Sequence, residues 1–131
     1  MDKRTGKPRF IHLTVSSAGA GNSVVNLQPN QGTYWILKMA WGFHSVAAGL
    51  SAGWYFTDPD TQNNLGPMLA ALAQNVPLPF GAAGSGQTTN LTNDFKISYT
   101  RYPSFIVVAT AAAQASFVDA LVEEVTGVPE A

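Results

Sequence analysis

The sequence contains no cysteine, and only 11% of its 131 residues are charged. The lack of cysteine excludes disulfide scaffolds, thiolate zinc sites and cysteine nucleophiles. The charged fraction is less than half of the roughly 25% that is typical of soluble domains. Hydrophobic residues make up 46% of the chain, so it can bury a core and is not a charge-rich disordered segment. The length fits one domain.

Charge is unevenly distributed along the chain, although the net charge is only −1. Residues 1–9 hold four cations and one acid (+3), whereas residues 10–131 hold three cations and seven acids (−4). We predict a flexible basic arm over residues 1–9, followed by a single domain over residues 10–131. The cations of the arm are Lys3, Arg4, Lys7 and Arg9. The net charge of −1 argues against a generally basic nucleic-acid binder, and we predict no specific nucleic-acid partner. The charge of the arm nevertheless suits contact with an acidic neighbouring subunit, with nucleic acid or with an anionic surface. The apolar run at 10–15 is too short for a secretory signal.

Hydrophobic alternation with a period of two predicts strands along most of the chain. In residues 33–43 the large apolar side chains share one parity, which we expect to face the core: Trp35, Leu37, Met39, Trp41 and Phe43. The opposite parity is expected to point outward, and it is partly apolar at Tyr34, Ile36 and Ala40. A membrane helix over residues 34–56 is the alternative, because this stretch carries one formal charge and aromatic residues at both ends. The period of two favours a strand and no membrane partner.

The remaining pattern also indicates short strands. We predict them over residues 9–15, around Val25 and Leu27, and over 50–57, 95–99 and 105–110. A change of period after Pro67 predicts one short helix near 67–74. Residues 116–125 fit a helix or a strand, and we favour a strand that pairs with 105–110, because β-branched residues are frequent there. Seven or eight strands with frequent turns predict an all-β fold, an antiparallel β-sandwich that is jelly-roll-like.

No catalytic or metal-binding motif is complete. The motif Asp58-x-Asp60-x-Gln62-x-Asn64 has the ligand spacing of a calcium loop but lacks its glycine and its closing glutamate, so we interpret it as a turn. The glycine-rich residues 81–86 are not followed by a helix that could hold a phosphate. His12 and His44 both fall at predicted outward positions without zinc-ligand spacing. We therefore predict no cofactor, no metal and no enzymatic activity.

In general character the chain resembles the small cysteine-free β-sandwich proteins of tailed-bacteriophage virions, such as head decoration (cement) or adaptor subunits. The resemblance lies in the turns rich in Gly, Ala, Thr and Asn, the alternating segment 34–43, and the closing segment 115–125 with Glu123 and Glu124. No motif of the family is matched, so no site residue is transferred. The resemblance implies a virion protein that is structural, oligomeric (a trimer by analogy) and attached to capsid or other virion proteins.

The low charge of the body fits this expectation, since the cores of protein interfaces are depleted in charge. Candidate assembly contacts are Lys3, Arg4, Lys7, Arg9, Tyr34, Ile36 and Tyr55. The leading alternative is a β-sandwich that binds carbohydrate or another ligand through Tyr55. An enzyme using Asp58 or Asp60 and a small membrane protein are further alternatives.

Overall fold

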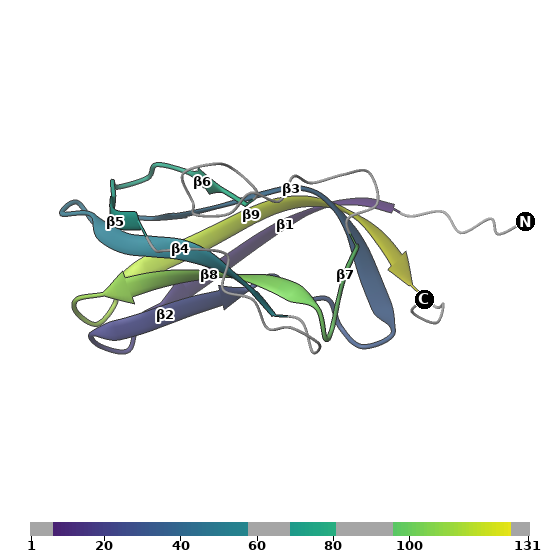
Figure 1. Cartoon of the computed structure of the whole chain (residues 1–131), viewed down its shortest axis with the longest axis horizontal. Helices are drawn as coiled ribbons and strands as arrows, with labels where there is room; N and C mark the ends of the chain where they lie inside the picture. Colours follow the sequence, from purple (N-terminus) through teal and green to yellow (C-terminus); the bar gives the residue numbers. More distant parts are fainter. Residues whose placement is uncertain (1–6, 58–68, 81–95, 127–131) are drawn as a thin grey trace, which may run out of the picture.

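The computed structural model describes residues 7–57, 69–80 and 96–126. These residues form nine strands in two antiparallel sheets that lie one above the other (Figure 1). Sheet A has the order β1-β9-β3-β6, with β7 also paired to β3, and sheet B has the order β2-β8-β4-β5. The strands are β1 (Lys7–Ser16), β2 (Gly21–Asn26), β3 (Thr33–His44), β4 (Leu50–Thr57), β5 (Leu69–Leu72), β6 (Leu78–Pro79), β7 (Lys96–Ser98), β8 (Tyr102–Ala109) and β9 (Ala115–Thr126).

The connections between the sheets give this sandwich its topology. The chain crosses from one sheet to the other between β1 and β2, β2 and β3, β3 and β4, β5 and β6, β7 and β8, and β8 and β9. Such repeated crossing, with antiparallel pairing throughout, is the arrangement of a jelly roll. The predicted all-β, jelly-roll-like sandwich is therefore confirmed.

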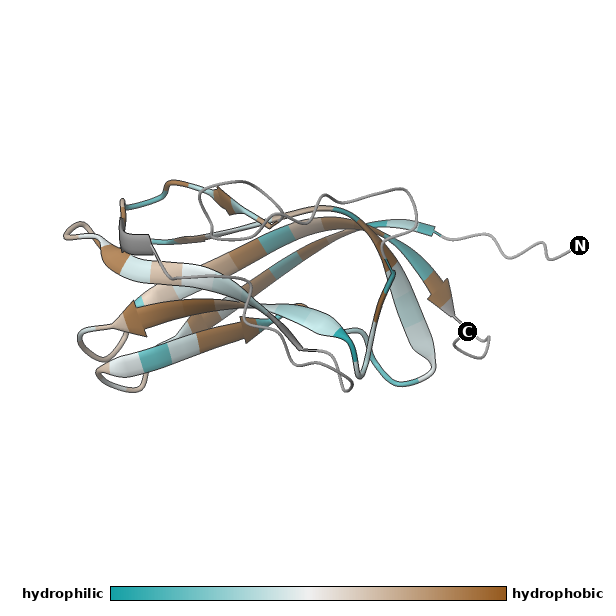
Figure 2. Ribbon diagram, viewed as in Figure 1, coloured by the Kyte–Doolittle hydropathy of each residue, from teal (hydrophilic) through white to brown (hydrophobic). Residues whose placement is uncertain are grey.

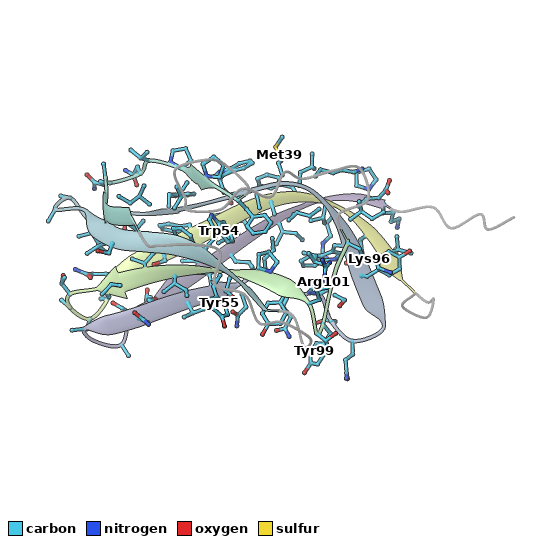
Figure 3. The ribbon with its side chains drawn as sticks, viewed as in Figure 1. Met39, Trp54, Tyr55, Lys96, Tyr99 and Arg101 are labelled. Atoms are coloured by element: carbon cyan, nitrogen blue, oxygen red, sulfur yellow. The ribbon has the colours of Figure 1, made fainter. Side chains whose placement is uncertain are left out.

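The core lies between the two sheets and is built around Trp54 of β4. Its ring packs 5.2 Å from the ring of Phe105 and 5.3 Å from that of Phe80, measured between centroids. The indole Nε1 donates a hydrogen bond to the carbonyl of Leu78 at 2.9 Å, so this buried polar group is satisfied. Figure 3 shows Trp54 between the sheets, and Figure 2 shows that β8, the strand of Phe105, is apolar along much of its length. Buried and more exposed residues alternate along β9 and along the second half of β8. Each sheet therefore has one face buried in the core, because successive side chains of a strand point to opposite faces.

Strand β3 contains a β-bulge that reverses its alternation. Leu37 pairs with Val122 and Met39 pairs with the neighbouring Leu121, so β3 has one residue more than β9 at this point. The extra residue is Lys38, which is exposed. Because successive side chains of a strand point to opposite faces, one inserted residue exchanges the faces for the rest of the strand.

The bulge corrects the predicted core. Trp35 and Leu37, which precede it, are buried as expected. After it, the buried positions of β3 are the small or polar ones: Ala40, Gly42 and His44. The large side chains that we expected inside lie on the other face: Met39, Trp41 and Phe43.

Three further predictions are wrong in part. Leu69–Leu72, within the predicted helix at 67–74, is strand β5, because pairing with β4 outweighs the local helix propensity. Residues 67–68 lie outside the described ranges. Residues 116–125 do form a strand, but β9 pairs with β1 and β3 rather than with β8, since the turn at 110–114 crosses between the sheets. Finally, β1 begins at Lys7, so Lys7 and Arg9 belong to a strand and not to an arm.

Candidate functional site

The outward surface of sheet A carries an ordered array of large side chains. Residues directly opposite each other in an antiparallel pair project to the same side of the sheet. The register of β1, β9 and β3 therefore places nine residues on one surface, in three rungs across the strands. The first rung is Phe10, Leu121 and Met39, the second is His12, Asp119 and Trp41, and the third is Thr14, Phe117 and Phe43. We call these nine residues the outer face.

The first rung is apolar and exposed. The exposed fractions are 60% for Phe10, 48% for Met39 and 36% for Leu121. Figure 3 shows Met39 pointing away from the sandwich. Three neighbouring large hydrophobic residues at these exposures form one contiguous patch, and such patches mark interaction sites in soluble proteins.

Aromatic contacts hold the rest of the outer face in place. Phe43 and Phe117 stack with their centroids 4.8 Å apart, and Phe10 lies 6.5 Å from Trp41. His12 stacks 6.0 Å from Phe117. Because these side chains restrain one another, binding of a partner here would cost little side-chain conformational entropy.

An ion-pair partner and a hydroxyl lie beside His12 in the centre of the outer face. The Nδ1 atom of His12 contacts the Oδ1 atom of Asp119, and its Nε2 atom lies 3.4 Å from the hydroxyl of Thr14. The order carboxylate, imidazole, hydroxyl is the order of a nucleophilic triad. Here it stands on an open strand surface, because His12 and Thr14 are both exposed. The predicted outward position of His12 is confirmed.

His44 has a structural setting instead. It is fully buried, contrary to the prediction, because the bulge at Lys38 turns it inward. Its Nδ1 atom accepts a hydrogen bond from the amide of Val46 at 3.1 Å. Its Nε2 atom must then carry the proton, and it donates to the carbonyl of Leu72 at 2.5 Å. The side chain thereby joins the end of β3 to the end of β5.

Most charged side chains of the described residues lie at the end of the sandwich where β1 begins and β9 ends. The Oε2 atom of Glu124 accepts hydrogen bonds from Arg9 Nη1 at 2.6 Å and from Trp35 Nε1 at 2.9 Å. The hydrogen bond from Trp35 is the main cause of a pKa of Glu124 below its usual value, and Arg9 and Lys7 add to it, while burial acts in the opposite direction.

Two more cations lie at this end of the sandwich. Lys96 Nζ lies 4.7 Å from the centre of the Tyr34 ring, and Arg101 Nη1 donates to the Lys96 carbonyl at 2.6 Å. Figure 3 shows Lys96 and Arg101 close together. Cations from both halves of the sequence are therefore gathered here, around Glu124 and its neighbour Glu123.

The candidate assembly contacts do not form a single surface. Lys7 and Arg9 lie at the start of β1, and Tyr34 and Ile36 are half-buried on β3 between β7 and β9. Tyr55 is half-buried on sheet B, on the opposite side of the sandwich from Met39 (Figure 3). Lys3 and Arg4 lie outside the described residues, as do the motif at 58–64 and the glycine-rich loop at 81–86.

Sequence reasoning missed the outer face. The signal that could have found it is the presence of Phe10, Phe117 and Leu121 at the parity of β1 and β9 opposite to the core residues. The assignment of Met39, Trp41 and Phe43 to the core concealed the third strand of this surface.

The described residues offer no group of three or more His, Cys, Asp or Glu that could hold a metal ion. A hollow of about 290 Å³ lies at the turn between β1 and β2, where it is lined by residues 15–24. None of these lining residues is titratable. In the ranges that the model describes, no helix has the length and apolarity needed to cross a membrane.

Comparison with known proteins gives a fold likeness. No family model matches the chain, and no curated protein matches it either. Among solved structures it is similar to a chain from work described as "Bacillus endospore appendages form a novel family of disulfide-linked pili". The two chains are 14% identical, the match covers 97% of this chain and 93% of the other, and the TM-score is 0.47. The present chain has no cysteine and cannot form disulfides of its own.

Proposed function

We propose that this protein is a non-enzymatic structural subunit that associates with further copies of itself through the outer face. The observation that carries the proposal is the exposed first rung of Phe10, Leu121 and Met39. Interfaces are enriched in aromatic residues and methionine and depleted in charge at their centres. The outer face fits that composition, since six of its nine residues are large and apolar.

The charge of this surface suits a second copy as the partner. Asp119 is paired with His12, and in the rung beside the outer face Glu123 lies on the same side of the sheet as Lys96. Glu123 and Lys96 carry opposite charges, so two such surfaces do not repel each other strongly. This surface has no strong net charge that would attract a strongly charged partner.

In its finer form, the proposal places the subunit on a tailed-bacteriophage particle, as a capsid decoration or minor structural protein that forms a trimer. The support for this form is the general resemblance of the sequence and the low charge of the body. The mass of the assembly separates a trimer from a dimer, because each chain contributes 13.9 kDa.

The test uses sedimentation equilibrium over the micromolar range on the wild type and on Leu121→Lys. We expect the wild type to associate and the variant to bind at least tenfold more weakly, since the new charge would be buried at the interface. Val24→Lys is the matched control, because Val24 is similarly exposed (40%) but lies on sheet B. A wild type that stays monomeric would overturn the proposal, and so would equal weakening by the control.

A further inference from the structure

One carboxylate ties the start of β1 to two other strands. In the register of sheet A, Lys7 and Trp35 both lie opposite Glu124, on the inward side of the sheet. Glu124 accepts hydrogen bonds from Trp35 of β3 and from Arg9 of β1. It therefore links β1, β9 and β3 at the end of the sandwich.

The start of β1 has little else to hold it. Within the described residues, β1 pairs only with β9 and is the edge strand of sheet A. Pro8 has no amide hydrogen to give to the ladder. The ion pair alone would contribute little, because the Arg9 side chain is 53% exposed. The Glu124 side chain is only 21% exposed, and hydrogen bonds to a charged group that is partly shielded from water are stronger.

The next residue along β1 belongs to the outer face. Phe10 follows Arg9 directly and is the most exposed member of the first rung. If residues 7–9 detach from β9, the backbone that positions Phe10 loses its support on one side. The charge at Glu124 is therefore coupled to the geometry of the outer face.

We propose that Glu124 is a latch that holds the first residues of β1 against the sheet and so keeps Phe10 in place for self-association. When the carboxylate loses its charge, the first residues of β1 detach from the sheet. This inference rests on the proposed function, because it describes the regulation of the same surface.

The sign of the pH dependence follows from the groups around Glu124. Lys7 and Arg9 face it from β1 and Trp35 faces it from β3, while Glu123 projects to the other side of the sheet. The pKa of Glu124 lies below its ordinary value of 4.5, chiefly because of the hydrogen bond from Trp35. The stabilisation is fully present above pH 4.5 and is lost as the pH falls through the lowered pKa.

The first arm of the test measures amide hydrogen exchange of residues 7–12 in the wild type and in Glu124→Gln, which keeps the shape and removes the charge. We expect exchange to rise about fivefold in the variant, because its neutral amide oxygen accepts weaker hydrogen bonds than the carboxylate does. Glu123→Gln is the matched control, and we expect it to leave exchange within about twofold of the wild type. Acid should lower the protection factors of these residues in the wild type, once the pH dependence of the intrinsic exchange rate is divided out, and should have little further effect in Glu124→Gln.

The second arm measures self-association of the same proteins, with Phe10→Ala as the positive control. We expect Glu124→Gln to weaken association severalfold. Unchanged exchange in Glu124→Gln would overturn the latch. If exchange rises in Glu124→Gln while its association stays unchanged, and Phe10→Ala does weaken association, then Glu124 is not coupled to association. The proposed function would still stand in that case. A wild type that never associates overturns the proposed function and the coupling with it, while exchange still decides whether Glu124 holds β1.

Discussion

Replacing Gly42 by alanine tests the contact through which the two sheets close on each other. Gly42 lies on the buried side of β3, and the ring of Phe105, from β8 in the other sheet, packs directly against it. A Cβ atom at Gly42 would lie closer than 3.0 Å to three ring atoms, a separation that real Cβ atoms essentially never show. Either the ring or the β3 backbone must move.

The size of the effect follows from how freely Phe105 can move. Its side chain is fully buried, and the Trp54 ring stands 5.2 Å away, so the ring cannot turn aside without disturbing the core. Overpacking of this kind costs about 1–3 kcal/mol. Alanine recovers about 0.5–1 kcal/mol, because it restricts the unfolded chain more than glycine does. We expect a net loss of about 1 kcal/mol, which moves the urea midpoint by roughly 0.5 M.

The measurement is the free energy of unfolding in urea of four proteins: the wild type, Gly42→Ala, Phe105→Leu and the double variant. A smaller side chain at 105 leaves room for the new methyl group, so the double variant should be more stable than the sum of the single losses predicts. Gly19→Ala is the control, because nothing lies within 4 Å of a Cβ there. If Gly42→Ala is as harmless as Gly19→Ala, or if the two losses simply add, the close approach of Phe105 to Gly42 does not limit the packing.

Two pairs of variants test the buried side and the register of β3. His44→Phe keeps the volume but leaves the Val46 amide and the Leu72 carbonyl without their partner, so unfolding free energy should fall by about 2 kcal/mol in the same assay. His12→Phe on the exposed outer face should change it by less than about 1 kcal/mol, and similar losses for both would refute the role of His44. Deleting Lys38 removes the bulge without exchanging the faces of β3, so the variant should keep its β-sheet circular dichroism. Deleting Ile36 moves Trp35 to the outward side and should unfold the protein. If the Ile36 deletion keeps its β-sheet circular dichroism and the Lys38 deletion loses it, the assigned register is wrong.

Much of the fold could be predicted from the sequence, because the alternation of apolar residues is local. The strands of residues 9–15, 33–43 and 50–57 fall within a few residues of β1, β3 and β4. The partner of β9 could not be predicted in this way. Its segment follows β8 after a turn, where a hairpin is the expected connection, but the jelly roll sends the chain to the other sheet at this point. Strand partners depend on contacts far apart in sequence, and alternation contains no information about them.

The candidate site was missed because of a single residue. Lys38 carries no turn chemistry, so nothing in the sequence marks the bulge that it makes. The usual rule that large apolar residues face the core then assigns Met39 and Trp41 to the wrong side. The rule fails after the bulge because a large ring already fills the space opposite β3: Phe105 occupies the volume that a bigger side chain at Gly42 would need.

The exchange of faces in β3 after the bulge supports the proposed self-association. A strand with small residues inside and large apolar residues outside leaves part of its outward apolar surface in water while the protein is alone, and that part contributes no hydrophobic stabilisation. In β3 these outward residues continue, across β9 and β1, into Leu121 and Phe10 with no intervening charge in the first rung. Removing that rung from water needs a second surface, and the proposed self-association supplies one. Under this proposal, the low charge of the chain reflects two buried surfaces, namely the core between the sheets and the interface with a second copy.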